Sequence, residues 1–305
     1  MKLEVSGIIP PMVTPFTWDT EELDEKAIRE ETEYLIQSGC HGLCIGGSTG
    51  EGAGLSEQEV YILCKVVVEQ AKDRVSIIGG IIADTTREAI RKSQAAKEAG
   101  VSSLQITPPH YLWTPSTAGL TRYYQEIGDA VRLPILIYNV VPWVNIDVHT
   151  MKEIAQVEWV AGIKQSGGDM HKVADMVSEL HDRMTVLTAV DDLLYPSFCL
   201  GVDGAISCLL AVFPETTLNM WNKVQAGDFA GAKALHDRLL PVWRVIEGPD
   251  MPFLAKTAIE WMGRRVGPAR SPIMAPTEQK QTEIRDRLVE AGFSVVNELP
   301  AHFLS

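Results

Sequence analysis

One lysine, Lys164, lies inside a short apolar run, "VAGIKQSGG", that ends at Gly167 and Gly168. In a β-strand, alternation places Lys164 on the opposite face from its neighbours Ile163 and Gln165. If that face is an interior one, burial favours the neutral amine, which is a nucleophile able to form a Schiff base with a carbonyl. The alternative is a lysine at a strand end whose ammonium group reaches solvent.

A tyrosine and a glycine-rich segment could assist such chemistry. Tyr138 ends the apolar run "PILIYNV", where a phenol can move protons, although a core aromatic is the alternative. In "GGSTGEG", residues 46–52, glycines such as Gly47 leave backbone amides free, while Ser48 and Thr49 add hydroxyl donors. The segment suits a carboxylate and lacks the Gly-Lys-Ser/Thr of a phosphate-binding loop. An ordinary tight turn is the alternative there.

These residues need a scaffold that brings strand ends together. Short β-rich runs alternate along the chain with longer segments of helical period. The runs are residues 7–16, 42–48, 76–82, 103–109, 134–140, 161–166, 184–190 and 204–210. The segment from Ser56 opens with a Ser-x-x-Glu capping box, and Gly39, Gly100 and Gly201 stand where helices would end before three of these runs. Strands and helices in alternation predict parallel strands.

The alternation predicts an α/β fold of the (β/α)8, or TIM barrel, type over residues 1–226. An open doubly wound sheet is the alternative, but no Gly-x-Gly-x-x-Gly turn follows the first run, which argues against its nucleotide-binding forms. The sequence pattern of residues 227–305 predicts further helices and no new strand. We therefore expect a C-terminal helical extension packed on the barrel. In a barrel, chemistry belongs at the C-terminal ends of the strands.

Composition and charge exclude several classes of partner. A formal net charge of -13, spread over 305 residues, leaves no basic stripe for nucleic acid and would repel an anionic membrane. No apolar stretch approaches the roughly 18 residues that span a bilayer, and the start lacks the features of a signal peptide. We therefore expect a cytoplasmic protein. The five cysteines form no CxxC pair, so we expect reduced, mostly buried thiols and no metal site.

Four motifs together resemble a known family. "GGSTGEG" after the second strand, "TPPHY" after the fourth, "YNV" at the fifth and "GIKQSGGD" at the sixth have the order and separations of the dihydrodipicolinate synthase/N-acetylneuraminate lyase family of class I aldolases. The resemblance covers nearly the whole chain. It implies a barrel, a homotetramer built as a dimer of dimers, and a lysine that forms a Schiff base with pyruvate or another 2-oxo acid. It also implies that no metal or organic cofactor is needed.

The resemblance assigns catalytic roles to four residues. Lys164 matches the Schiff-base lysine, and Tyr138 matches the tyrosine that moves protons at the Schiff base. Thr49 belongs to the hydroxyl pair that binds the carboxylate of the 2-oxo acid. Tyr111 matches a tyrosine lent across the dimer interface.

The resemblance also implies substrate-binding residues. Ser48 is the other member of the hydroxyl pair, and Gly47 precedes it in the loop. Ile206, in "GAIS", matches a residue whose backbone lies beside pyruvate.

Several positions depart from the family pattern and bear on the substrate. Where dihydrodipicolinate synthases carry an arginine for the carboxylate of aspartate semialdehyde, this chain has Trp143, which we expect to be a buried indole that shapes the pocket. Asp191 and Asp192 resemble an acidic pair that binds sugar hydroxyls in the lyases; the alternative is the N-cap and first turn of a helix. Val190 replaces a usual glycine, and Cys208 replaces a serine of the neuraminate lyases.

The sequence therefore predicts a Schiff-base lyase or aldolase that joins or separates pyruvate, or a related 2-oxo acid, and an aldehyde. A dehydratase or deaminase on the same scaffold is the first alternative. A true 4-hydroxy-tetrahydrodipicolinate synthase, despite Trp143, is another. A non-catalytic 2-oxo-acid binding protein would be expected to lack Lys164 or Tyr138, and both are present.

Overall fold

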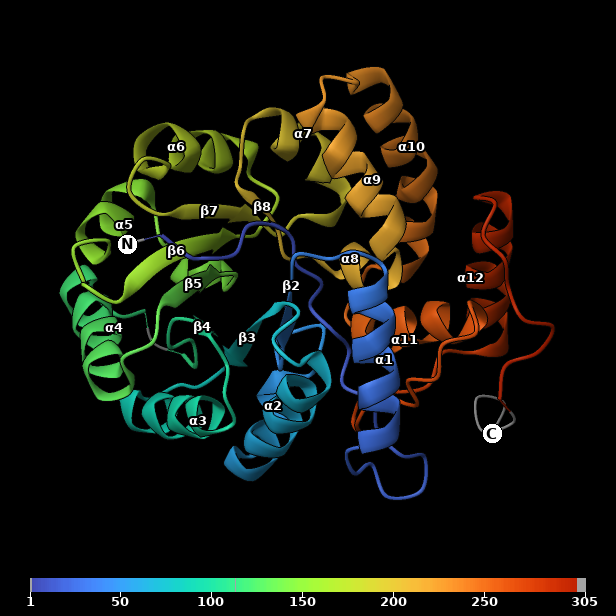
Figure 1. Cartoon of the computed structure of the whole chain (residues 1–305), viewed down its shortest axis with the longest axis horizontal. Coiled ribbons are helices and arrows are strands. Elements are labelled where there is room, and N and C mark those ends of the chain that lie inside the picture. Colours follow the sequence, from blue (N-terminus) through green and yellow to red (C-terminus); the bar gives the residue numbers. More distant parts are fainter. Residues whose placement is uncertain (1, 113, 301–305) are drawn as a thin grey trace.

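A computed structural model describes residues 2–112 and 114–300 of the chain. Eight parallel strands lie in the order β1-β8-β7-β6-β5-β4-β3-β2, as a TIM barrel requires (Figure 1). The strands are β1 (Gly7–Ile8), β2 (Gly42–Ile45), β3 (Ser76–Ile81), β4 (Ser103–Ile106), β5 (Ile135–Asn139), β6 (Val160–Gln165), β7 (Thr185–Thr188) and β8 (Gly204–Ala205). The barrel predicted from the sequence is confirmed, and each of the eight strands overlaps one of the predicted runs.

Helices surround this barrel and continue beyond it. Those that follow the strands are α1 (Glu25–Gln37), α2 (Glu57–Ala71), α3 (Thr86–Glu98), α4 (Thr117–Val131), α5 (Val148–Ile154), α6 (Met170–Leu180), α7 (Leu194–Cys199), α8 (Cys208–Val212) and α9 (Pro214–Gln225). The C-terminal extension contributes α10 (Phe229–Ile246), α11 (Met251–Trp261) and α12 (Glu278–Glu290), which lie to the right of the barrel in Figure 1. The predicted helical extension is confirmed, whereas its division from the barrel at residue 226 stays a prediction.

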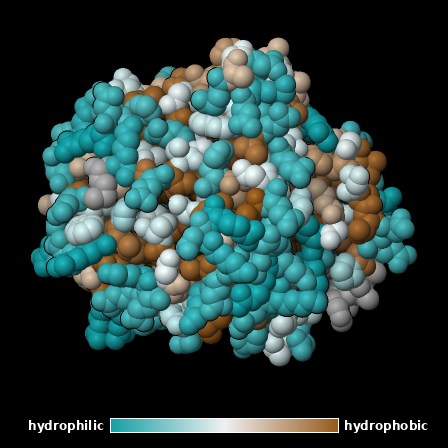
Figure 2. Space-filling view, in the orientation of Figure 1, coloured by the Kyte–Doolittle hydropathy of each residue, from teal (hydrophilic) through white to brown (hydrophobic). Residues whose placement is uncertain are grey.

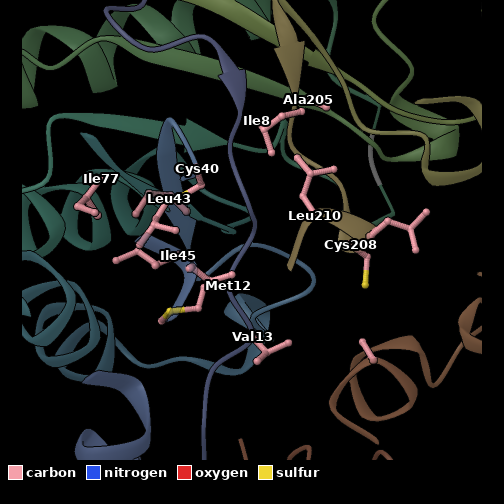
Figure 3. Close-up of a cluster of buried hydrophobic side chains, with 14 of the residues drawn as sticks. Ile8, Met12, Val13, Cys40, Leu43, Ile45, Ile77, Ala205, Cys208 and Leu210 are labelled. Carbon is pink, nitrogen blue, oxygen red and sulfur yellow. The ribbon is translucent and has the colours of Figure 1, made fainter. Parts of the chain in front are cut away.

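Backbone hydrogen bonds close the ring between the first and last strands. Ile8 of β1 pairs with Ala205 of β8, and the two side chains lie next to each other in Figure 3. On the other side, the amide of Cys44 donates to the Pro10 carbonyl, 3.0 Å away, and the amide of Met12 donates to the Cys44 carbonyl. The chain that follows β1 therefore completes the barrel against β2.

Two predicted strands are much shorter than their apolar runs. The run 204–210 ends as a strand at Ala205, and α8 begins at Cys208, because a short apolar run does not distinguish a buried strand from a buried helix. Gly204 fits tightly against β1: a Cβ atom there would lie 2.1 Å from the Gly7 carbonyl oxygen. The helix signals were more reliable, since Ser56 and Glu59 form the predicted capping box.

A small apolar cluster fills the barrel interior and is separate from the larger core between strands and helices. Its buried members are Val5, Ile9, Cys44, Ile78, Leu136, Leu187 and Ile206. The larger core includes Leu43, Ile45 and Ile77, which Figure 3 shows on β2 and β3. The strands are thus buried on both faces, as parallel strands usually are.

The surface in Figure 2 is mostly hydrophilic, with apolar side chains scattered between polar ones. No helix in the described ranges is long and apolar enough to cross a membrane. Within residues 2–112 and 114–300, no group of three His, Cys, Asp or Glu side chains could hold a metal ion. All five cysteines are free thiols, and Cys199 alone is exposed.

Candidate active site

Lys164 points into the barrel near the C-terminal end of β6. It pairs with Tyr138 of β5 on one side and with Leu187 of β7 on the other, and Leu187 belongs to the interior cluster. Residues paired across neighbouring strands share a face of the sheet, so all three side chains face the interior. Only 3% of Lys164 and 6% of Tyr138 is exposed. The alternative of a lysine that reaches solvent is therefore wrong.

The Lys164 amine lies over the Tyr138 ring, with Nζ 3.7 Å from the ring centroid. At this distance a cationic amine is attracted by the negative face of the aromatic ring. The contact holds the amine beside the phenol, so that one hydroxyl group and one amine share a small space. This is the arrangement expected of a nucleophile with a neighbouring proton carrier.

A cavity of about 280 Å³ opens above this pair. It is formed by residues at the C-terminal strand ends together with residues of the helical extension. Six predicted site residues line it: Lys164, Tyr138, Ser48, Thr49, Ile206 and Asp191. The other lining residues are Val140, Ser166, Ala189, Ser207, Cys208, Trp243, Gly248 and Met251.

The loop that carries Ser48 and Thr49 is tightly built. The amide of Gly52 donates to the Gly47 carbonyl at 2.9 Å, and a Cβ atom at Gly52 would lie 1.7 Å from the Gly46 carbonyl oxygen. Only glycine fits such a close approach of two backbone segments. Gly47 itself contributes to the turn and does not line the cavity.

Asp191 is a buried carboxyl group on the cavity wall. Its Oδ1 accepts a hydrogen bond of 2.7 Å from the amide of Leu209, in the first turn of α8. Burial raises the pKa of Asp191 to about 7, and the Leu209 amide and the Lys164 amine oppose this rise. Asp192 instead pairs with Arg244 of α10 at 2.8 Å. Asp191 thus binds the start of a helix. That helix is α8, and not α7, which is the next α-helix after Asp191 in the sequence.

Two thiols near Lys164, one in the barrel interior and one in the cavity wall, are poor nucleophiles. Burial raises the pKa of Cys44, in the barrel interior, to about 11. Burial also raises the pKa of Cys208, and the nearby Asp191 carboxylate adds to the effect. A thiol reacts as its thiolate, so both cysteines are inert near neutral pH. Among the side chains that line this cavity, the amine of Lys164 is the other candidate nucleophile.

Besides Gly47, two predicted site residues, Tyr111 and Trp143, lie outside the cavity in the single chain. Tyr111 is 63% exposed, in the segment after β4, where its amide donates to the Asp84 carboxylate. Trp143 is 60% exposed, and its indole N–H donates to the His110 carbonyl at 2.7 Å. The expectation of a buried indole that shapes the pocket is therefore wrong for the single chain. The indole packs across the loop after β4 because its N–H finds an acceptor there.

Sequence reasoning missed the three lining residues from the C-terminal extension. Trp243 lies in the last turn of α10, Gly248 follows that helix, and Met251 is the first residue of α11. No motif marks them, because they are separated from Lys164 by about a quarter of the chain and lie in, or directly after, ordinary amphipathic helices. Val140, Ser166, Ala189 and Ser207 follow strand ends, so the rule for barrel sites could have identified them.

Comparison with known proteins decides the family. The dihydrodipicolinate synthetase family matches residues 4–291. The chain belongs to this family. A 4-hydroxy-tetrahydrodipicolinate synthase from Methanopyrus kandleri is 31% identical over 295 residues, covering 96% of this chain and 98% of the relative. One from Symbiobacterium thermophilum is 33% identical over 288 residues, covering 93% and 97%.

Solved structures of the dihydrodipicolinate synthetase family superimpose well on this chain. A dihydrodipicolinate synthase from Bacillus anthracis has a TM-score of 0.89 at 29% identity and covers 94% of this chain and 98% of its own. YagE from E. coli K12, solved in complex with pyruvate, has a TM-score of 0.89 at 28% identity, covering 95% and 100%. The protein is a lyase of the dihydrodipicolinate synthetase family, as the sequence predicted.

We expect Asp191→Asn to change how stability depends on pH. A folded-state pKa of about 7, raised from 3.8, means that Asp191 contributes stability below pH 4 that is lost as the pH rises through 7. Asparagine has no such charge to bury and still offers an oxygen to the Leu209 amide. The variant should therefore gain a few degrees in Tm relative to the native protein between pH 5 and pH 8. A Tm difference that does not change with pH would contradict this.

Proposed function

We propose that the protein is a class I aldolase in which Lys164 forms a Schiff base with pyruvate or a related 2-oxo acid. One observation carries the proposal: the buried amine lies 3.7 Å from the ring centroid of Tyr138, in a cavity that Ser48 and Thr49 also line. The nucleophile, a proton carrier and donors for a carboxylate are thus within one space. A 2-oxo acid offers the carbonyl and the carboxylate that such a space accommodates.

The residues support a simple sequence of steps. The neutral Lys164 amine attacks C2 of the 2-oxo acid, and loss of water gives a cationic iminium group. The iminium accepts the electron pair released when the C3–H or C3–C4 bond breaks, which gives a neutral enamine. Tyr138 moves protons to the C2 oxygen, which leaves as water, and from the amine, and it accepts the proton from C3 or from the C4 hydroxyl group when the enamine forms. Ser48, Thr49 and nearby amides hold the carboxylate. Reversal of the C3–C4 step joins the enamine to an aldehyde.

The cavity lining favours an aldehyde without a second carboxylate. Among the described lining residues, Lys164 is the only cationic side chain, and Trp243 and Met251 form an apolar wall. A carboxylate buried there would lack a cationic partner beyond the Schiff base itself. Arg122, another potential partner, lies on α4 with its side chain 81% exposed. We therefore propose an apolar or hydroxylated aldehyde.

A 4-hydroxy-tetrahydrodipicolinate synthase is the second candidate, since the relatives above carry that name. Trp143, which the sequence suggested as an obstacle, lies outside the cavity of the single chain. The two candidates differ in product. Incubation with pyruvate and aspartate semialdehyde should give little condensation under the first proposal, and a rate that matches the best alternative aldehyde under the second.

We also propose that the protein acts as a cytoplasmic homotetramer, with Tyr111 reaching the site of a second copy. The exposure of Tyr111, together with 73% exposure of the neighbouring Leu112, supports an interface at this loop. Sedimentation measures the oligomeric state. Loss of turnover in Tyr111→Phe, restored in mixed oligomers with a Lys164→Met chain, would support a role across the interface.

We expect Trp143→Ala to leave capture of pyruvate nearly unchanged. The indole lies outside the cavity that holds Lys164. Surface substitutions change the free energy of unfolding by about 0.5 kcal/mol at most, and we expect an effect no larger on the affinity for pyruvate, which is roughly twofold. Borohydride trapping at a series of pyruvate concentrations measures the effect. A tenfold weaker capture would contradict it and return Trp143 to the site.

A further inference from the structure

A buried ion pair lies directly behind the loop that carries Ser48 and Thr49. Lys256 of α11 donates to Glu51 Oε1 at 2.7 Å, and the side chains are 0% and 6% exposed. The residues are separated by 205 positions in the sequence, so the pair ties the C-terminal extension to the loop after β2. Neither side chain lines the cavity around Lys164.

Both oxygens of the Glu51 carboxylate accept a hydrogen bond. Its second oxygen, Oε2, accepts a hydrogen bond of 2.8 Å from the amide of Arg270. Lys256 donates a second hydrogen bond, at 2.5 Å, to the Pro268 carbonyl, and its ammonium group lies over the Phe16 ring. Burial lowers the pKa of Lys256 to about 8, and the Glu51 carboxylate opposes this shift. The contacts fix both groups in one geometry.

The pair is connected to the cavity through a short stretch of backbone. Glu51 adopts a left-handed conformation, with φ of 56°, which is uncommon for a residue other than glycine. Its amide donates to the Ser48 carbonyl at 3.1 Å, and the Gly50 carbonyl accepts a buried hydrogen bond of 2.6 Å from Thr14. A displacement of Glu51 therefore displaces Ser48 and Thr49.

Stability alone is a weak reason for such a pair. Desolvation of two buried charges offsets much of their attraction, so an ion pair of this kind adds little net stability. What the ion pair adds is a fixed position for Glu51. Here that residue holds an unusual backbone conformation two positions after Thr49.

We propose that Glu51 and Lys256 are positioning residues that set the affinity of the Ser48–Thr49 loop for the carboxylate of the 2-oxo acid. This proposal rests on the proposed Schiff-base function. The ion pair touches no reacting atom. It acts through the loop, so the C-terminal extension contributes to substrate affinity as well as to the cavity wall.

The test compares Glu51→Gln, Lys256→Met and the double variant. In Glu51→Gln, the amide group cannot accept from both Lys256 and the Arg270 amide, so one of the two hydrogen bonds is lost. We expect the pyruvate concentration for half-maximal borohydride trapping to rise about tenfold or more, the effect of a lost hydrogen bond to a charged group. The maximal extent of trapping at Lys164 should stay unchanged. The double variant should resemble either single variant, because the two residues act as one unit.

Glu31→Gln provides a matched control. Glu31 forms another buried ion pair, with Arg264 at 3.3 Å, and its side chain is 1% exposed. This pair joins α1 to the segment after α11 without touching the loop of residues 46–52. We expect Glu31→Gln to lower Tm with no change in half-maximal trapping. If it weakened trapping as much as Glu51→Gln does, a general loss of structure would explain both and the proposal would be wrong.

The native protein is trapped with pyruvate first, which separates the two proposals. A native chain without an adduct contradicts the proposed function, and the positioning role falls with it. A native adduct with unchanged affinity in Glu51→Gln and Lys256→Met contradicts the positioning role alone. If Lys256→Met does not fold, the milder Glu51→Gln decides, together with hydrogen exchange of the amides of residues 48–54. Faster exchange there than in Glu31→Gln supports the proposal, and equal exchange contradicts it.

Discussion

Lys164→Met is expected to lose covalent capture of pyruvate completely. Methionine keeps a buried, unbranched side chain of similar size, so the barrel interior stays filled while the amine is removed. Borohydride reduction of the native protein with pyruvate should add a stable mass to the peptide that contains Lys164. Turnover should fall by about 10⁴- to 10⁶-fold, as it does when an enzyme loses its nucleophile.

A second buried lysine makes the assignment specific. Lys256 is fully buried, as Lys164 nearly is, but it is paired with Glu51 and lies outside the cavity. Lys256→Met at high pyruvate concentration should therefore still give the adduct at Lys164. Labelling of Lys256 in the native protein, or of any lysine in Lys164→Met, would overturn the assignment.

The sequence predicted the barrel because its signals were local. Each strand is followed by an amphipathic helix with its own start and stop, such as the capping box at Ser56 and the left-handed Gly39, Gly100 and Gly201. The ends of β1 and β8 were harder to predict. Gly7 and Gly204 pack backbone against backbone there, and whether "SCLLAV" continues as a strand or turns into α8 depends on tertiary packing.

The site was predictable where strand geometry determines it and unpredictable elsewhere. Lys164 and Tyr138 face the interior by alternation, and their pairing across β5 and β6 follows from parallel register. Trp243 and Met251 reach the same cavity from the extension, through packing that no local pattern encodes. Trp143 shows the opposite error, because a match by sequence position placed a side chain in the site that a hydrogen bond to His110 holds outside it.

Tyr138→Phe is expected to separate folding from proton transfer. The ring is buried beside Lys164, and phenylalanine keeps that ring and its contact with the amine while removing one hydroxyl group. Tm should therefore change little, and the barrel interior should remain packed. Turnover should fall roughly 10²- to 10⁴-fold, the usual contribution of a positioned acid–base group.

The two steps of adduct formation allow a sharper test. Attack of the amine on C2 needs the neutral amine, whereas loss of water from the resulting alcohol needs a proton delivered to its oxygen. If Tyr138 delivers that proton, Tyr138→Phe should form the borohydride adduct slowly but to the same final extent. Because the ring contact with Lys164 is retained, a low final extent would instead indicate that the amine had been displaced. A variant that forms the adduct at the native rate and turns over normally would show that Tyr138 is a core aromatic and that protons reach the Schiff base by another route.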